Sequence, residues 1–284
     1  MLQRVVIVAQ MIRFEHTVFA LPFAYIGALL VEHRIPSGHD LLWITLAMVG
    51  ARTGAMSLNR IIDRHVDKAN PRTAERALPR GILSVAEVWV YAVLSFILLG
   101  LAAMQLSPLA AKLFPFAVFI LAAYSYTKRF TWACHLWLGM ALGITPVASW
   151  IAIANGFTLA PVLLGLGVLF WVAGFDIIYA CLDYNFDREH RIHSIPARFG
   201  IVRALRVALV FHVLAPVLFA AAGLMLGLGA FYFIGVGIAA GLLMYEHMIA
   251  NPADPARINV AFFHVNVALS LTMFVFTLAD VLIG

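Results

Sequence analysis

Nine near-continuous apolar segments constrain this chain more than any other feature of its sequence. Each is about 17 to 25 residues long, the length that a helix needs to cross the hydrocarbon core of a bilayer. Backbone polar groups must be satisfied internally in lipid, so helices are the structures that such segments form. The predicted spans are residues 15–32, 41–58, 85–106, 109–127, 134–154, 158–182, 204–226, 228–249 and 258–282.

The composition agrees with a membrane protein. Hydrophobic residues make up 63% of the chain and charged residues 12%, whereas a soluble domain carries roughly 25% charged residues. We expect an all-α, multi-pass membrane protein with nine transmembrane helices around a central cavity, and a single domain over residues 1–284. Residues 1–13 mix apolar and polar side chains, which predicts a short interfacial helix before the first span.

The basic residues predict how the chain crosses the membrane. If the spans alternate, 16 of the 19 Lys and Arg residues fall on the side of the N-terminus. Short loops rich in Lys and Arg mark the cytoplasmic side. We therefore expect a prokaryotic cytoplasmic membrane, with the N-terminus and the active site facing the cytoplasm. The net charge of +5 comes from these loops and gives no reason to expect a nucleic acid partner.

Two polar motifs end apolar spans and share one spacing. The first holds Asn59, Asp63 and Asp67, and the second, about 120 residues later, holds Tyr179, Asp183 and Asp187. Four residues is one helical turn, so on continued helices each trio shares one face. Carboxylates stacked in this way repel each other, and hard oxygen ligands select Mg²⁺ with a phosphate as co-ligand. We therefore predict that Asp63, Asp67, Asp183 and Asp187 hold Mg²⁺.

A basic loop follows each acidic motif. Residues 68–81 contain four basic side chains, and residues 188–200 resemble them in length and charge. Arginines beside metal-binding carboxylates suit a diphosphate, because its charge exceeds what one or two Mg²⁺ ions neutralise. An ordinary cytoplasmic loop would also be basic. The repeat of motif and loop indicates a weak internal duplication that brings the two motifs face to face across the cavity.

Charged residues inside or beside the spans are further candidates. Arg52 and Asp176 are costly in lipid and should face the bundle interior, either at the site or in structural contacts between helices. Arg13 at the mouth of the first span either marks the interface or binds an anionic acceptor. Tyr124 and Lys128, one turn apart, are weak evidence alone but form a third wall of an anion site beside the two motifs.

The motifs resemble the signature motifs of the UbiA superfamily of intramembrane aromatic prenyltransferases, and the resemblance covers the whole chain. They read Asn59-x-x-x-Asp63-x-x-x-Asp67, Tyr124-x-x-x-Lys128 and Asp176-x-x-Tyr179-x-x-x-Asp183-x-x-x-Asp187. Residues 13–17 and 70–76 are most similar to the 4-hydroxybenzoate polyprenyltransferase branch and its menaquinone-pathway relatives. One departure is Arg60, which stands where many members have an Asp.

The resemblance implies a Mg²⁺-dependent transfer of a polyprenyl group from its diphosphate to an aromatic carboxylate acceptor within the bilayer. The expected acceptor is 4-hydroxybenzoate or a dihydroxynaphthoate, as in ubiquinone and menaquinone biosynthesis. Asp176, with Tyr179, would orient the acceptor or take its ring proton, and Tyr124 and Lys128 would act on the diphosphate. The other substrate-binding candidates are Asn59, Arg64, Arg72, Arg129, Arg13 and Arg52.

Three alternatives share these features. The first is prenylation of another acceptor. The second is an ion-coupled transporter, in which Arg52, Asp176 and the acid pairs form a path with acids near the membrane midplane. The third is a non-catalytic isoprenoid-binding membrane protein.

Overall fold

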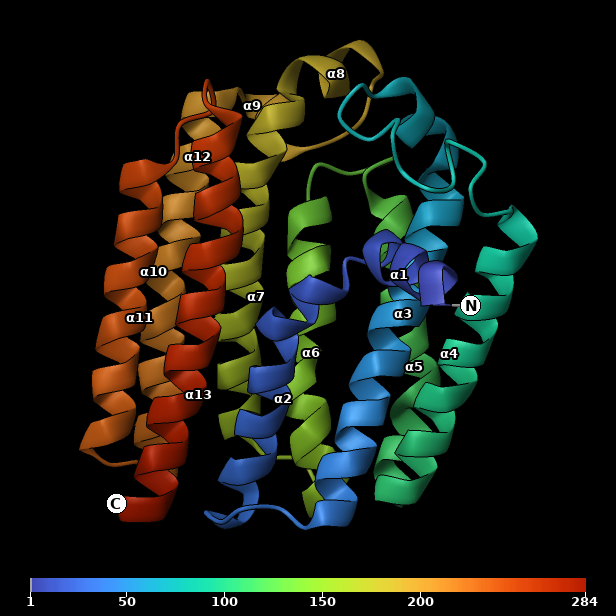
Figure 1. Ribbon diagram of the computed structural model, residues 1–284. Helices are drawn as coiled ribbons and strands as arrows, with labels where there is room; N and C mark the ends of the chain where they lie inside the picture. The colour runs from blue at the N-terminus through green and yellow to red at the C-terminus, as the bar shows by residue number, and fades with distance from the viewer. Residues whose placement is uncertain (1) are drawn as a thin grey trace.

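The computed structural model describes residues 2–284, and the elements that it assigns are helical (Figure 1). They are α1 (Leu2–Met11), the 3₁₀ turn η1 (Phe14–His16), α2 (Thr17–Glu32), α3 (Gly38–Ala69), α4 (Val85–Leu106), α5 (Pro108–Thr127), α6 (Cys134–Ala154), α7 (Leu159–Ala180), the 3₁₀ turn η2 (Cys181–Asp183), α8 (Tyr184–Glu189), α9 (Ile195–Phe199), α10 (Ile201–Leu226), α11 (Ala230–Ile249), α12 (Pro255–Val260), the π-helix η3 (Ala261–Val265) and α13 (Asn266–Ile283).

The prediction of an all-α, multi-pass fold is confirmed. Within residues 2–284, eight helical segments are long and apolar enough to cross a membrane. The first predicted span, residues 15–32, corresponds to α2, whose apolar stretch Phe19–Glu32 is shorter than the others. The predicted interfacial helix corresponds to α1, apart from residue 1, which lies outside the described part of the chain.

The long helices stand side by side in one bundle, with α2 and α6 between the α3–α5 group and the group of α7, α10, α11 and α13 (Figure 1). Aromatic side chains fill the interior beside α2: the ring of Phe23 lies 5.2 Å from Trp171 and 5.6 Å from Phe219, centroid to centroid. The outer faces are apolar as well. On α4, Val90, Leu94, Ile97 and Leu101 follow helical spacing and are each 50–58% exposed, as a lipid-facing stripe requires.

Glycines let α6 and α7 approach to backbone contact. A Cβ atom added at Gly139 would lie 2.3 Å from the carbonyl oxygen of Leu169, and one added at Gly143 would lie 2.5 Å from that of Gly165. Small residues allow this close packing between membrane helices. His135 stands one turn before Gly139, so the same contact brings its side chain against α7.

The two polar motifs differ in backbone structure. Helix α3 begins at the N-cap Ser37, whose Oγ accepts a hydrogen bond from the backbone N–H of Asp40 at 3.1 Å, and it runs unbroken past Asp67. The spacing predicted that the second motif would lie on one continued helix, and this prediction is wrong. Helix α7 ends at Ala180, and the chain passes through η2, with Asp183 at φ −97° and ψ 7°, before α8 begins.

Candidate functional site

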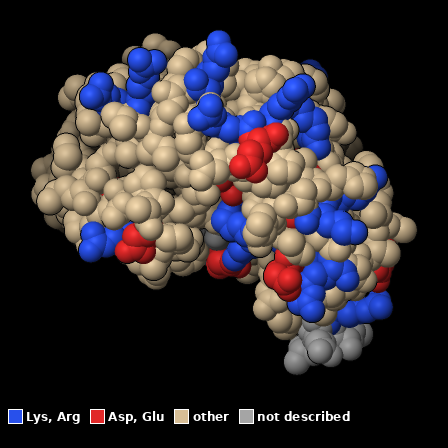
Figure 2. All heavy atoms as spheres, turned by 90° about the horizontal axis from the view of Figure 1, so that it is seen from above, with Lys and Arg blue, Asp and Glu red and all other residues tan. Residues whose placement is uncertain are grey.

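Both polar motifs face a single cavity of about 580 Å³. Its walls come from α3, α5, α6 and α7, from the loop after α3 and from the segment between α8 and α9. The end of the bundle that holds this cavity carries many Lys and Arg side chains with acids among them (Figure 2). Of the residues predicted from the sequence, all except Arg64 and Arg129 line this cavity.

The first carboxylate of the α3 motif is surrounded by donors. Asn59 donates from Nδ2 to Oδ2 of Asp63 at 2.8 Å. Lys128 Nζ lies 2.6 Å from the same oxygen, and a guanidinium nitrogen of Arg129 lies 3.4 Å from Oδ1. The Asp63 side chain is 2% exposed, so its charge is held by these partners rather than by bulk water.

Asp67 is paired with two arginines. A guanidinium nitrogen of Arg76 lies 2.7 Å from its Oδ1, and one of Arg60 lies 3.9 Å from its Oδ2. Arg60 is buried and also donates from Nε to the carbonyl oxygen of Met11 at 3.0 Å. Arg60 therefore pairs with a motif acid and connects the end of α1 to α3.

Asp183 joins the two halves of the site. Arg72 donates from Nε to Oδ1 of Asp183 at 2.9 Å and from its other nitrogens to Oδ2 and to the hydroxyl of Tyr179. Asn70 donates to the same Oδ1 at 2.9 Å. Burial opposes the charge on Arg72, but hydrogen bonding and Coulombic attraction to Asp183 outweigh it and raise the pKa of this guanidinium.

Asp187 is held by the segment that follows α8. The hydroxyl of Ser194 donates to Oδ2 of Asp187 at 2.9 Å and also accepts the backbone N–H of Ala197, which caps α9. Asp187 is buried and lines the same cavity as Asp183. The turn at η2 thus leaves both acids of the second motif on one cavity although they share no continuous helix.

The acid deepest in the second motif, Asp176, has a partner that the sequence analysis missed. Nδ1 of His135 lies 2.6 Å from Oδ2 of Asp176. His135 is buried, and its Nε2 accepts the backbone N–H of Ile195 at 3.3 Å. The sequence indicated only that His135 lies in the first turn of the predicted span 134–154. No regular spacing relates His135 to either motif, so its contact with Asp176 could not be predicted.

The remaining predicted residues fall into two groups. Arg52 donates to the carbonyl oxygen of Arg13 at 3.3 Å, while its buried Nε has no partner among the described residues. A guanidinium nitrogen of Arg13 lies 3.4 Å from Oε1 of Glu15 at the rim of the cavity. Arg64 and Arg129 do not line the cavity: Arg64 donates to the carbonyl oxygen of Ile61, and Arg129 donates to that of Ile62 while a second contact reaches Asp63.

The donor set at this cavity fits Mg²⁺ chemically. It offers carboxylate and amide oxygens, the hard ligands that this ion prefers. Asp63 Oδ1 and Asp67 Oδ2 are buried and accept no hydrogen bond within the described part of the chain. In residues 2–284, however, no three His, Cys, Asp or Glu side chains lie close enough together to hold a metal as they stand. Asp63, Asp67 and Asp183 are paired with basic side chains instead, so metal binding requires these ion pairs to rearrange.

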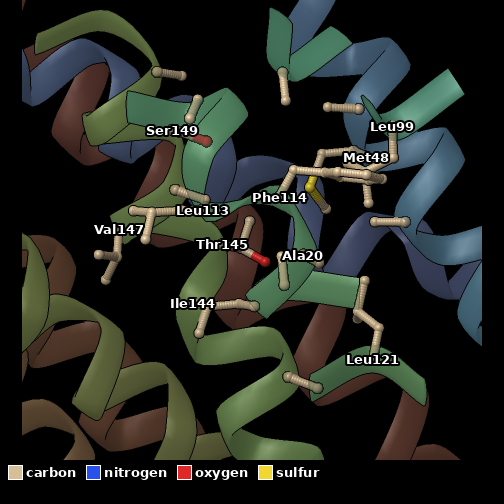
Figure 3. Close-up of a pocket in the computed structure, with 18 of the residues that line it drawn as sticks. Ala20, Met48, Leu99, Leu113, Phe114, Leu121, Ile144, Thr145, Val147 and Ser149 are labelled. Carbon is tan, nitrogen blue, oxygen red and sulfur yellow. The ribbon is translucent and has the colours of Figure 1, made fainter. Parts of the chain in front are cut away.

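An apolar cavity of about 380 Å³ adjoins the polar one (Figure 3). Arg52, Met56, Tyr124, Leu138 and Leu142 line both, so the two spaces meet at the level of Tyr124. Beyond that level the walls are side chains of α2 to α6. Among them are Ala20, Met48, Leu99, Phe114, Leu121, Ile144 and Thr145.

Residues 20–268 match the UbiA prenyltransferase family. The chain belongs to this family. It is therefore a prenyltransferase and an integral membrane protein, and the resemblance that the motifs indicated is confirmed.

Relatives named 4-hydroxybenzoate octaprenyltransferase align with most of the chain. It is 32% identical over 241 residues to the 4-hydroxybenzoate octaprenyltransferase of Aromatoleum aromaticum, covering 84% of this chain and 80% of that protein. It is 31% identical over 227 residues to the protein of the same name from Vibrio cholerae, covering 78% of each.

Solved structures of this family have the same fold. The apo structure of a UbiA homolog from Aeropyrum pernix is 33% identical, with a TM-score of 0.85 over 94% of this chain and 98% of that one. A UbiA homolog from Archaeoglobus fulgidus bound to GPP and Mg²⁺ is 20% identical, with a TM-score of 0.69 over 95% of this chain and 99% of that one.

Proposed function

We propose that this UbiA-family protein transfers a polyprenyl group from polyprenyl diphosphate to a ring carbon of an aromatic carboxylate, either 4-hydroxybenzoate or a dihydroxynaphthoate, in quinone biosynthesis. The observation that carries the proposal is the bridge from Arg72 and Asn70 to Asp183. It places two acidic motifs and their basic partners on one cavity. Relatives named 4-hydroxybenzoate octaprenyltransferase support this acceptor class.

The diphosphate would bind between the two motifs. Lys128, Arg72 and Arg129 already contact carboxylates there. Their hydrogen bonds could pass to phosphate oxygens when polyprenyl diphosphate enters the cavity. Arginine forks match phosphate geometry bidentately, which favours Arg72 for this role. The hydroxyl of Tyr124 and the amide of Asn59 line the same cavity and could donate hydrogen bonds. Arg64, which bonds its own helix, is the weakest of the predicted phosphate ligands.

Asp63, Asp67, Asp183 and Asp187 are the residues that would hold Mg²⁺. The ion, when bound, would supply positive charge to the leaving diphosphate. Breaking the allylic C–O bond leaves its electron pair on the diphosphate, and the basic side chains would stabilise this developing charge.

The apolar cavity would hold the isoprenoid tail. It begins at the level of Tyr124 and continues between α3, α5 and α6, so a tail can extend from the diphosphate site without meeting a charged group other than Arg52. The unpartnered Nε of Arg52 at this junction supports binding of the acceptor carboxylate, with Arg13 at the rim as the second candidate. Asp176, with Tyr179, would then face the acceptor ring.

We further propose that α2 is a ninth span of a single domain covering residues 1–284. Its Phe23, Ile26 and Leu30 are buried against helices that are themselves long enough to span. The basic face in Figure 2 would be cytoplasmic, with the N-terminus inside, by the positive-inside rule. Relatives from bacteria support a prokaryotic cytoplasmic membrane.

A direct assay tests this function. The purified protein in detergent is given Mg²⁺ and geranyl diphosphate, with 4-hydroxybenzoate and dihydroxynaphthoates offered in parallel reactions, and prenylated products are detected by mass spectrometry. We expect product from one acceptor, none with EDTA, and none from Asp63→Ala or Asp183→Ala. Mg²⁺-dependent diphosphate binding without any product would favour another acceptor or the binding-protein alternative, and no binding at all would exclude the proposed reaction.

A further inference from the structure

The buried pair of His135 and Asp176 lies at the base of the polar cavity, on two helices in backbone contact. Nδ1 of His135 is 2.6 Å from Oδ2 of Asp176. The His135 side chain is 3% exposed, whereas that of Asp176 is 26% exposed and lines the cavity. His135 also lines the cavity, but its side chain is almost fully covered, so Asp176 is the more exposed of the pair toward the space that a substrate would enter.

The second nitrogen of His135 determines which tautomer is present. Nε2 faces the backbone N–H of Ile195 at 3.3 Å. A backbone N–H can only donate, so Nε2 must accept and, in a neutral ring, the proton is assigned to Nδ1. Nδ1–H then donates to Oδ2 of Asp176, which accepts. The short distance agrees with a charge-assisted hydrogen bond.

The partners of Asp176 leave one oxygen available. Among residues 2–284, Oδ1 of Asp176 accepts no hydrogen bond, while Oδ2 is held by His135. The segment that fixes His135 also fixes a motif acid, because Ser194, adjacent to Ile195, binds Asp187. The orientation of Asp176 is therefore tied to the end of the cavity where the diphosphate would bind.

We infer that His135 is a positioning residue that holds Asp176 ionised and directs its free oxygen at the acceptor ring, where Asp176 removes the ring proton. This inference rests on the proposed prenyl transfer. In that reaction, a bond forms between the allylic carbon and a ring carbon as the C–O bond to the diphosphate breaks. The C–H bond at the same ring carbon then breaks, its electron pair restores the aromatic ring, and the proton passes to Asp176.

The test uses the acceptor that the wild-type protein turns over, in two forms. One form carries hydrogen and the other carries deuterium at the ring carbon that is prenylated, and their rates are compared. In the wild type we expect a deuterium isotope effect on kcat near unity, because proton loss restores aromaticity and is faster than ionisation. In His135→Ala, Asp176 loses its orienting donor. We expect kcat to fall by about 100-fold, the lower end of what a positioned general base contributes, with an isotope effect well above unity.

Two further variants separate positioning from a general loss of structure. His135→Asn keeps an N–H donor near the Nδ1 position and should recover about tenfold of the lost rate, since one retained hydrogen bond of about 1.4 kcal/mol corresponds to that factor. His190→Ala is the matched control, because His190 is exposed just after α8 and, within residues 2–284, its ring interacts with Phe186 of that helix. It should behave as the wild type does.

Binding of geranyl diphosphate with Mg²⁺, measured separately, should be unchanged in His135→Ala. Wild-type kcat in His135→Ala, or a lower kcat with the isotope effect still near unity, would overturn the role of His135 while leaving the proposed function intact. A wild-type protein that prenylates none of the acceptors would overturn the proposed function, and this role with it.

Discussion

Nε of Arg72 lies 2.9 Å from Oδ1 of Asp183, a residue 111 positions later in the chain. This contact closes the gap between the two acidic motifs, and the guanidinium also donates to the hydroxyl of Tyr179 at 2.9 Å. Arg72 thus occupies the position between the motifs that a diphosphate would take. A polyprenyl diphosphate that enters the cavity would replace one anionic partner of Arg72 with another. The positive charge is therefore already in place before the diphosphate binds.

Arg72→Lys should therefore be a poor substitute. A lysine keeps the charge but cannot bridge Asp183, Tyr179 and a phosphate with a planar fork. We expect KM for geranyl diphosphate to rise by about tenfold or more, because a hydrogen bond to a charged group contributes about 1.5–3 kcal/mol. Steady-state kinetics at saturating acceptor measure this change. Arg80→Lys, at an exposed arginine paired with Glu75, is the control, and an Arg72→Lys protein with wild-type KM would contradict the assignment.

Gly139→Ala should separate α6 from α7. Its new Cβ would lie 2.3 Å from the carbonyl oxygen of Leu169, a distance that only a backbone shift can relieve. Overpacking of this kind costs about 1–3 kcal/mol, and the shift occurs one turn from the contact of His135 with Asp176. We expect lower thermal stability in detergent and lower activity. Gly241→Ala is the matched control, since no atom lies within 4 Å of its added Cβ; equal stability in both variants would refute the packing argument.

Filling the apolar cavity should change the preference for donor length. Ala148 on α6 lines this cavity but not the polar one, whereas Tyr124 and Leu138 line both. Ala148→Phe would occupy space that a long tail needs but that geranyl diphosphate does not reach. We expect kcat/KM for a long-chain donor to fall about tenfold relative to the short donor, within the cost of about 1–3 kcal/mol for an overfilled site. Ala148→Ser is the small control. An unchanged ratio would show that the tail lies elsewhere.

The sequence predicted the parts of this site that follow from local spacing. Acids at four-residue intervals stand out in apolar helices, and α3 carries its trio on one continuous face as expected. The helical spans were predictable for the same reason, since length and apolarity decide them. Asp176 was identified because a carboxylate inside a span is rare.

Other features depend on contacts between distant segments and leave no local pattern. The break at η2 and the π-helix η3 interrupt segments whose spacing looks helical throughout. His135 acquires its role only because glycines bring α6 against α7 and because α9 presents the N–H of Ile195. Similarly, the role of Arg60 depends on where α1 ends, and the pairing of Asp67 with Arg76 and of Asp183 with Arg72 depends on the folded loop after α3.

We propose that both acidic motifs act on one diphosphate in one cavity. The most direct measurement is the rate of prenyl transfer in Asp63→Asn, Asp183→Asn and the double variant, each with Mg²⁺ and geranyl diphosphate. Residues that act as a unit give strongly non-additive losses. We predict that each single variant loses nearly all activity and that the double variant loses little more. Losses that multiply in the double variant, or a single variant that keeps the wild-type rate, would contradict a shared site.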